Sequence, residues 1–427
     1  MGRATEGADR VWGRPASSSG RGWRGTLPPG AVACPLDKDC QPAMDSLERF
    51  AREKLRRIDK AALRRHLVET DRQGGIHVRR GGRTLLSFCC NDYLNLSQEP
   101  ELKAAAVRAV ETLGVGAGAS RLVTGNHSLY QELEGRLAKL KQTEAACVFG
   151  SGYLTNLGVI PTLVGAGDLV VLDELSHACI HAGTSVSAAR CARFRHNDLE
   201  HAEQLLKEHR SHARRALIVT DGVFSMDGDL APIEDLADLA ERFDAWLMTD
   251  DAHGIGVLGG GRGSSFLGGT KARVPLQMGT LSKAVGSYGG YLCASEDVIE
   301  LVRNRARPLI YSTGLPPAAV AASIAALDWI ENHPEQAALP LAKAQRFTQA
   351  VGLPKAQSSI VPLVLGAPER ALEASLRLER EGFLVTAIRP PTVPEGTARL
   401  RITFTAAHED ADVDRLAELV RDRILGA

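Results

Sequence analysis

The amino-acid sequence predicts an α/β protein, with a mostly parallel sheet covered by helices on both faces and a smaller α+β domain at the C-terminal end. Short apolar runs alternate with helical patterns from about residue 85 to 295, which is the signature of parallel strands joined by helices. Polar and ionisable side chains follow several of these runs, where open α/β sheets place their ligand sites. With 427 residues, the chain is long enough for about two or three domains.

Six apolar runs are predicted strands, because each is short, rich in aliphatic residues and bounded by polar turn residues. They cover residues 145–149, 168–172, 215–221, 245–250, 275–280 and 289–295. The segments between them carry apolar residues at helical spacing over 99–113, 128–141, 153–164, 198–209 and 232–243. In the last of these, Ile233, Leu236 and Leu239 share one face, and Pro232 suits the first turn of a helix.

The C-terminal segment has mixed helix and strand patterns. A helix over 316–333 leads to strands within 360–365, 383–388 and 398–406 and to helices over 368–381 and 409–425. We therefore predict a tail over 1–43, a helical and strand arm over 44–90, a large domain over 91–330 and a small domain over 331–427. The tail is dense in Gly, Pro, Ser and Arg, which is typical of disorder. As an alternative, the tail results from the choice of a start site upstream of Met44. The acidic residues of the tail disfavour an organelle transit peptide.

Composition excludes several classes of protein. Lys plus Arg and Asp plus Glu both number 51, so no net charge draws the chain to nucleic acid or to an anionic membrane. The eight cysteines include no C-x-x-C pair, which favours a reduced compartment. No apolar run approaches the roughly 18 residues that span a bilayer. We therefore expect a soluble, cytoplasmic protein.

The strongest candidate site lies after two successive predicted strands. Asp250 and His253 stand in TDDAHGIG, and Lys283 stands in TLSKAVGSYGG. This is what a pyridoxal phosphate site needs, since the lysine forms the Schiff base and the carboxylate keeps the pyridine nitrogen protonated. Taken singly, Lys283 also fits a solvated loop, Asp250 a helix N-cap and His253 a structural histidine, so the prediction rests on their combination. No second His or Cys stands at metal-ligand spacing from His253, and we expect no metal.

The turn in FGSGYLTN (149–156) is a candidate phosphate site, because it joins a predicted strand to a helix through Gly-Ser-Gly. Backbone N–H groups and the positive end of the helix dipole hold phosphates at such turns. We assign Gly152 and Tyr153 to the phosphate, with the hydroxyls of Thr280 and Ser282 on the other side. Alone, the turn is more typical of a tight strand-to-helix connection, and its position before the Asp/Lys pair is what favours a phosphate site.

Two further strand ends carry candidate residues. His177 stands in DELSHACIHAG, and its imidazole could stack on the pyridine ring and hydrogen-bond a substrate carboxylate. A helix-capping or surface histidine is the alternative. Ser225, in TDGVFSMDGD, is placed to donate a hydrogen bond to the phenolic oxygen of the cofactor beside His253.

Several long motifs give the sequence a specific resemblance to the α-oxoamine synthase family. They are NDYLNLS, GAGASRLVTGNHSLYQELE, SGYLTN, DELSHA, DGVFSMDGDLAPI, DDAHGIGVLG and TLSKAVGSYGGY. The similarity covers about residues 45–425. It implies fold type I of the pyridoxal phosphate-dependent transferases, with a seven-stranded sheet in the large domain, and it implies a homodimer with active sites at the subunit interface.

Carried over position by position, the resemblance makes Lys283 the Schiff-base lysine and assigns three sets of residues. The catalytic set is Lys283, His177, Asp250 and His253; the cofactor-binding set is Gly152, Tyr153, Ser225, Asp250, His253, Thr280 and Lys283; the substrate-binding set is Arg64, Asn91, His177, Arg389 and Thr392. Arg389 would pair with the carboxylate of the amino acid through its planar fork. Arg65 adjoins Arg64 and is the alternative to it.

Within the family, the stretch AIRPPTVPEGTARLRITFTAAH (387–408) favours condensation of L-alanine with a pimeloyl thioester, carried on coenzyme A or acyl carrier protein, with loss of carbon dioxide. The alternatives are a sister enzyme that uses glycine with a short acyl-CoA or succinyl-CoA, an aminotransferase, and a non-catalytic subunit that binds pyridoxal phosphate. The family pattern SNDYLGL is changed here at Cys90 and Asn95. Because Asn tolerates a positive φ better than most residues, we expect the turn at position 95 to survive.

Overall fold

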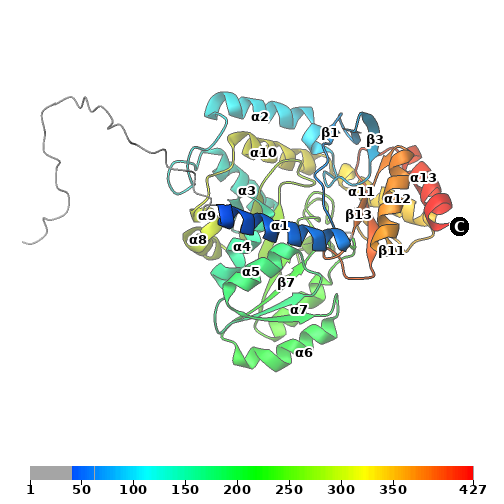
Figure 1. Cartoon of the computed structure of the whole chain (residues 1–427). Coiled ribbons are helices and arrows are strands. Elements are labelled where there is room, and N and C mark those ends of the chain that lie inside the picture. Colours follow the sequence, from blue (N-terminus) through cyan, green and yellow to red (C-terminus); the bar gives the residue numbers. More distant parts are fainter. Residues whose placement is uncertain (1–40, 62, 427) are drawn as a thin grey trace, which may run out of the picture. The chain divides into compact units, whose positions relative to one another are not determined.

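The computed structural model describes residues 41–61 and 63–426, which form one compact unit up to Arg64 and another from Arg65 onward. The first unit contains helix α1 (Gln41–Lys60) (Figure 1). The predicted tail lies outside the described residues as far as residue 40. The domain boundaries at residues 90 and 330 remain predictions.

A seven-stranded sheet forms the centre of the second unit, in the order β4-β10-β9-β8-β7-β5-β6. Its strands are β4 (Ala145–Phe149), β5 (Leu169–Asp173), β6 (Arg190–Phe194), β7 (Ala216–Asp221), β8 (Trp246–Asp250), β9 (Leu276–Thr280) and β10 (Gly290–Ala294). Strand β10 is antiparallel to both neighbours, and the other pairs are parallel. The predicted fold class and all six predicted strands are confirmed.

Helices cover both faces of this sheet because alternate strand residues enter two different cores. In β7, Leu217 and Val219 face one core, and Ala216 and Ile218 face the other. The first face is covered by α4 (Gly152–Leu163), α5 (Ala178–Ser187), α8 (Glu296–Arg305) and α9 (Arg307–Ile310). The second face is covered by α6 (Leu199–His209) and α7 (Ile233–Arg242) on the β5–β8 side and by α2 (Pro100–Leu113), α3 (Leu129–Lys141) and α10 (Pro317–Asn332) on the β4–β10 side.

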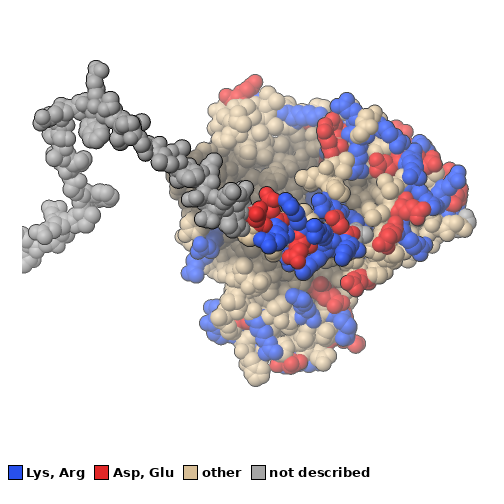
Figure 2. All heavy atoms as spheres, in the orientation of Figure 1, with Lys and Arg blue, Asp and Glu red and all other residues tan. Residues whose placement is uncertain are grey.

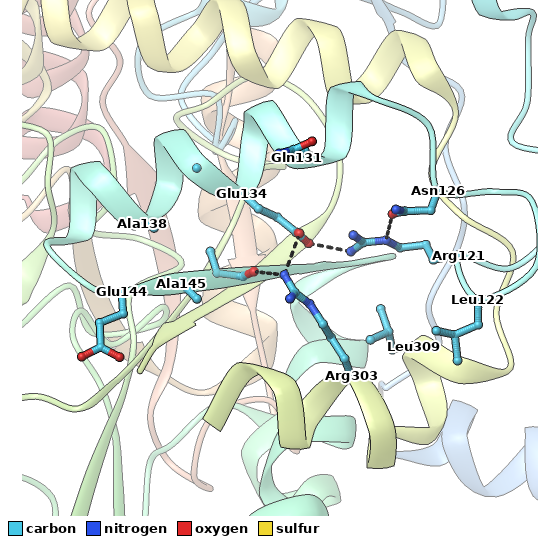
Figure 3. A pocket seen from close by; sticks show the side chains of 12 residues that line it. Arg121, Leu122, Asn126, Gln131, Glu134, Ala138, Glu144, Ala145, Arg303 and Leu309 are labelled. Carbon is cyan, nitrogen blue, oxygen red and sulfur yellow. Dashed lines mark hydrogen bonds and ion pairs between the residues drawn. The ribbon is translucent and has the colours of Figure 1, made fainter. Parts of the chain in front are cut away.

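Side chains close the free edge of β4, as Figure 3 shows. The buried carboxylate of Glu134 accepts from the backbone N–H of Val148 at 2.8 Å and from Arg121 at 2.6 Å. Arg121 also donates to the carbonyl of Val148, and Arg303 donates to Glu134 and to the carbonyl of Ala146, each at 3.1 Å. The N–H and the carbonyl of Val148 and the carbonyl of Ala146 are therefore satisfied at this edge without a further strand. The cavity of about 480 Å³ beside them is lined by Arg121, Glu134 and Arg303, which pair with one another, together with Glu144 and uncharged residues.

The C-terminal part confirms the predicted α+β character. Its sheets contain β11 (Ile360–Gly366), β14 (Ala398–Thr403) and β13 (Thr386–Ile388) in one and β1 (Asp71–Arg72), β2 (His77–Arg80), β3 (Arg83–Ser87) and β12 (Phe383–Leu384) in the other; its helices are α11 (Pro334–Val351), α12 (Pro368–Arg380) and α13 (Asp410–Leu419). In β14, Leu400 and Ile402 enter the core of this part, and the alternate residues Arg399 and Arg401 reach residues 225–227 of the large domain. One strand thus links the small core to the ligand side of the large sheet.

The surface carries both signs of charge. In the view of Figure 2, Lys and Arg are interspersed with Asp and Glu over α12 and α13, which agrees with the equal totals of 51. Within residues 41–61 and 63–426, no helix is long and apolar enough to cross a membrane. The expected turn at Asn95 is also confirmed, because this residue has φ 60° and precedes a short 3-10 helix (Leu96–Gln98).

A buried histidine in the C-terminal part predicts sensitivity to acid. His408 stacks on Phe88 at 3.9 Å, and burial lowers its pKa to about 4 from an ordinary value of 6.5. The folded chain keeps His408 neutral while the unfolded chain binds a proton below pH 6.5, so the stabilisation is present above that pH and is lost as the pH falls toward 4. We expect the free energy of unfolding to fall by about 2 kcal/mol between pH 7 and pH 5 from this group. Urea unfolding at both pH values checks this, and a drop of the same size in His408→Gln would contradict it.

Candidate active site

A cavity of about 150 Å³ lies at the carboxyl ends of β4, β7, β8 and β9. Its lining residues are Ser151, Gly152, Tyr153, His177, Cys179, Asp221, Asp250, Ala252, His253, Met278, Thr280, Ser282 and Lys283. Eight of the residues predicted from the sequence for catalysis or cofactor binding are therefore brought together here. The parallel strands explain the convergence, since their carboxyl ends meet at one edge of the sheet.

Asp250 is held firmly at the end of β8. Its Oδ1 accepts from the N–H of Ala252 at 3.0 Å, and its Oδ2 accepts from Asn156 Nδ2 at 2.7 Å. Asn156 is a fully buried residue of α4, which follows the Gly-Ser-Gly turn. The carboxylate thus makes the local turn contact of a capping residue and also lines the cavity.

Asp221 is a second buried carboxylate, which the sequence analysis missed. It closes β7 and is paired in register with Asp250 on β8. Burial, and after it the negative charge of Asp250, raise the pKa of Asp221 well above its usual range. Its Oδ2 accepts the backbone N–H of His177 at 2.9 Å. The signal in the sequence was its position, because both carboxylates end adjacent predicted strands.

His177 combines the two roles that the sequence left open. It is the N-cap of α5, where its Nδ1 accepts from the N–H of Cys179 at 3.3 Å, and it also lines the cavity. Burial lowers the pKa of His177. The negative charge of Asp250 acts to raise this pKa, and the positive charge of Lys283 acts to lower it. A neutral imidazole at this place is suited to packing against an aromatic ring.

Lys283 and His253 face the cavity from the loops after β9 and β8. Burial lowers the pKa of Lys283, with Asp250 opposing and Arg401 adding to the effect. Burial and the charge of Lys283 hold the pKa of His253 well below its usual range. His253 Nδ1 lies 2.7 Å from the hydroxyl of Tyr93, so Nε2 is the ring nitrogen that remains for a ligand.

The predicted phosphate turn begins α4. Ser151 is the N-cap and its side chain accepts from the N–H of Leu154 at 3.2 Å. The first N–H groups of a helix have no partner within the helix, which leaves Gly152 and Tyr153 for an anion. The hydroxyls of Thr280 and Ser282 lie 2.8 Å apart on the same cavity. A Cβ on Gly152 would stand 3.4 Å from Thr280 Cβ, so glycine keeps this space open.

Two of the remaining predicted residues line a neighbouring cavity of about 670 Å³, which shares His177 with the first. Ser225 lies on one of its walls, and Thr392 lies on the segment Pro390–Glu395. Arg65 donates to Thr392 Oγ1 at 3.2 Å. Arg389 precedes that segment and is not among the described residues that line either cavity.

Asn91 reaches the site through Arg401, a residue that the sequence analysis did not select. Asn91 Oδ1 accepts from Arg401 at 3.1 Å and from the hydroxyl of Tyr93 at 3.3 Å, and Arg401 also donates to the carbonyl of Ser225. Arg64, by contrast, pairs with Asp59 at 3.1 Å within the N-terminal unit. The alternation of Arg and apolar residues in ARLRIT was the available signal, because it places both arginines on the face opposite the core.

The residues of the first cavity fit pyridoxal phosphate. They provide a buried amine, a fixed carboxylate, a neutral imidazole and a helix start with two hydroxyls, which match the aldehyde, ring nitrogen, ring face and phosphate of that cofactor. Among the residues that the structure describes, no group of three or more His, Cys, Asp or Glu side chains could hold a metal ion.

Comparison with known proteins agrees with this assignment. The family model for aminotransferase class I and II matches residues 83–420. The 8-amino-7-oxononanoate synthase of Methylocella silvestris is 63% identical over 347 residues, which are 81% of this chain and 99% of that protein. The solved 8-amino-7-oxononanoate synthase of Francisella tularensis has a TM-score of 0.69 and 26% identity, and the match covers 80% of this chain and 98% of that one.

A further solved structure shows which cofactor occupies a fold of this kind. The serine palmitoyltransferase of S. paucimobilis, solved with pyridoxal phosphate joined to myriocin, has a TM-score of 0.81 and 28% identity, over 89% of this chain and 97% of that one. The chain therefore belongs to the pyridoxal phosphate-dependent family of aminotransferase class I and II and, within it, to the 8-amino-7-oxononanoate synthases.

Proposed function

We propose that this enzyme condenses L-alanine with a pimeloyl thioester, carried on coenzyme A or acyl carrier protein, and releases carbon dioxide to form 8-amino-7-oxononanoate for biotin biosynthesis. The observation that carries the proposal is the buried amine of Lys283 on the same cavity as Asp250 and His177. The identity of 63% to a relative that bears this name supports the reaction.

Pyridoxal phosphate, when bound, supplies an electron sink for the negative charge that proton removal leaves on the alanine Cα. We assign Asp250 to the ring nitrogen, His253 and Ser225 to the phenolic oxygen, His177 to the ring face, and Gly152, Tyr153, Thr280 and Ser282 to the phosphate. Lys283 would hold the cofactor through its side-chain amine.

Lys283 is the base in this proposal. Its free amine would take the proton from the alanine Cα and later return a proton to the product. A lysine in water has a pKa of about 10.4 and is charged at neutral pH. Burial lowers the pKa of Lys283, which increases the fraction of free amine that can accept the proton.

We assign the carboxylate of alanine to Arg401 rather than to Arg389. Arg401 is a buried guanidinium whose charge acts on both Lys283 and His253, and Asn91 and the carbonyl of Ser225 fix its orientation. A planar guanidinium binds a carboxylate with two parallel hydrogen bonds. The arrangement supports binding of an amino acid next to Lys283.

The thioester is proposed to enter the cavity of about 670 Å³, because that cavity reaches His177 and is large enough for an extended acyl chain. Its wall at Pro390–Glu395 belongs to the stretch that favoured the pimeloyl substrate in the sequence. Thr392 and Arg65 stand at this wall.

We further propose a homodimer in the cytoplasm. Tyr153 is 47% exposed beside the cavity, and the apolar residues Leu122 and Val123 of the family motif around position 120 and Val115 just before it are exposed as well. Exposed apolar residues of this kind are typical of an interface between subunits. The six cysteines of the described residues are all free, which suits a reducing compartment.

One assay tests the function. Release of carbon dioxide and free thiol is followed with L-alanine and pimeloyl-CoA, and with glycine and acetyl-CoA beside it, on protein loaded with pyridoxal phosphate. We expect turnover with the first pair. Turnover with glycine alone would reassign the protein to a sister enzyme, and keto-acid conversion without carbon dioxide would indicate an aminotransferase.

Substitution of Arg401 is expected to weaken binding of the amino acid. In Arg401→Lys, the paired contact to the carboxylate becomes a single one, so we expect KM for L-alanine to rise by about 10- to 100-fold. The matched control is Arg389→Lys, for which KM should stay within about twofold. The reverse pattern, with the larger change in Arg389→Lys, would return the role to Arg389.

A further inference from the structure

His196 lies behind the active site between two carboxylates. Its Nδ1 is 3.1 Å from both oxygens of Asp173, and its Nε2 is 2.7 Å from Asp229 Oδ2. The ring of Phe224 packs edge-on against the imidazole at 4.4 Å. None of the steps proposed above uses this histidine.

Each of the two carboxylates begins or ends a loop that reaches the active site. Asp173 is the last residue of β5, and the loop after it carries His177. Asp229 ends the loop that carries Ser225. Both loops line the cavity of about 670 Å³, one with Glu174–Ala178 and the other with Phe224–Asp227. His196 therefore joins two walls of that cavity from behind.

The neighbouring residue strengthens the same bridge. The N–H of Asn197 donates to Asp173 Oδ2 at 2.8 Å, and Asn197 Nδ2 donates to Asp229 Oδ2 at 3.0 Å. Asn197 has φ 55°, in the left-handed region that few residues other than Gly and Asn adopt readily. Two successive residues thus contact both carboxylates, one of them in an unusual backbone conformation.

Charge explains why a histidine suits this position. Burial acts to lower the pKa of His196, but hydrogen bonds to Asp173 and Asp229 raise it to about 10. At neutral pH the ring then carries a proton on both nitrogens and donates to a carboxylate on either side. Glu174, the third acidic group nearby, accepts the backbone N–H of His196 at 3.1 Å.

The inner ends of the two loops have anchors of their own. The N–H of His177 bonds to Asp221, and the carbonyl of Ser225 accepts from Arg401. Loss of the contacts of His196 to Asp173 and Asp229 should therefore change the spacing between the two loops that line the larger cavity. It should move the groups that hold the cofactor and the amino acid much less.

We propose that His196 is a positioning residue for the thioester, which by joining Asp173 to Asp229 sets the width of the cavity beside His177. The proposal rests on the proposed function, because that function assigns the cavity to the acyl thioester. His196 touches neither substrate nor cofactor in this arrangement, and it acts through the two loops.

The test uses the holoenzyme with His196→Leu and His196→Gln, and His212→Gln as the control at an exposed histidine. KM is measured separately for pimeloyl-CoA and L-alanine, and binding of pimeloyl-CoA without alanine is measured by calorimetry. We expect KM and Kd for pimeloyl-CoA to rise by about tenfold in His196→Leu and by less in His196→Gln, with KM for L-alanine within about twofold. If His196→Leu does not fold, His196→Gln carries the test, since its amide retains one hydrogen bond.

Unchanged KM and Kd for pimeloyl-CoA in the folded variants would overturn the proposal, and so would an equal rise in KM for both substrates, because that would indicate a general structural role. A wild-type enzyme that neither binds nor consumes the pimeloyl thioester, offered on coenzyme A and on acyl carrier protein, would instead refute the proposed function, and with it the substrate assigned to the cavity. These two failures are distinguished by the wild-type measurement alone.

Discussion

Replacing Lys283 with alanine is expected to abolish the release of carbon dioxide and thiol from L-alanine and pimeloyl-CoA. The variant loses both the covalent bond to the cofactor and the base that accepts the Cα proton. Positioned proton transfer contributes about 10²- to 10⁴-fold to enzymatic rates, so we expect a fall in kcat of at least about 10³-fold. The assay of gas and thiol release checks this result.

A second readout separates chemistry from folding. Borohydride reduction of the wild-type holoenzyme should fix pyridoxal phosphate to the protein and raise its mass, and the Lys283→Ala protein should show no such increase. Because the residues assigned to the cofactor phosphate are unchanged in this variant, we expect it still to bind the cofactor reversibly. Residual turnover near the wild-type rate would assign the base to another residue.

Replacing Asp250 with asparagine is expected to give the second largest loss. The amide has nearly the shape of the carboxylate, and Oδ1 can still accept the N–H of Ala252 at about the present 3.0 Å. It has no charge to keep a proton on the ring nitrogen, and it presents a second amide to Asn156. Loss of one preorganised electrostatic contact costs about 10²- to 10³-fold in kcat, which is the fall we expect for this variant.

The matched control for Asp250→Asn is Asp221→Asn. Burial and the negative charge of Asp250 raise the pKa of Asp221 well above its usual range, which disfavours its charged form, and its Oδ2 accepts the backbone N–H of His177, a contact that an amide oxygen can also make. We therefore expect Asp221→Asn to retain much more activity than Asp250→Asn. An equal loss in the two variants would contradict the division of roles between the two carboxylates.

The sequence predicted the sheet well where strands give a continuous apolar run, and it failed at one of the two edges, at β6. Strand β7 is buried throughout and gives a continuous apolar run, whereas Arg190, Cys191 and Arg193 of the edge strand β6 are exposed. The charges of RCARF obscured the apolar pattern, and they are also what keeps an exposed edge from pairing with other chains. The charged residues of β6 thus suit an edge strand, and they are also the reason that its apolar pattern did not predict a strand.

The site was predictable where chemistry follows a strand end, as at Asp250 and Lys283, and those residues do lie on one cavity. Arg401 could not be found in that way, because it lies inside strand β14 and not after a strand end, and it follows Lys283 by more than a hundred residues. Its approach to Asn91 depends on how the small core packs on the large domain. The alternation of arginine and apolar residues in ARLRIT predicts that Arg401 points away from the small core. Only the tertiary structure shows that it contacts Asn91 and the carbonyl of Ser225.

Strand β14 has a consequence for how mutations in this enzyme will be recognised. Leu400 and Ile402 fill the small core, and the intervening Arg401 holds Asn91 and the loop at Ser225. A truncated core side chain that shifts the strand also shifts the guanidinium. Genetic screens for lost activity will therefore recover core positions in β14 as well as cavity residues. Substitutions in this core that preserve activity must leave the position of Arg401 unchanged.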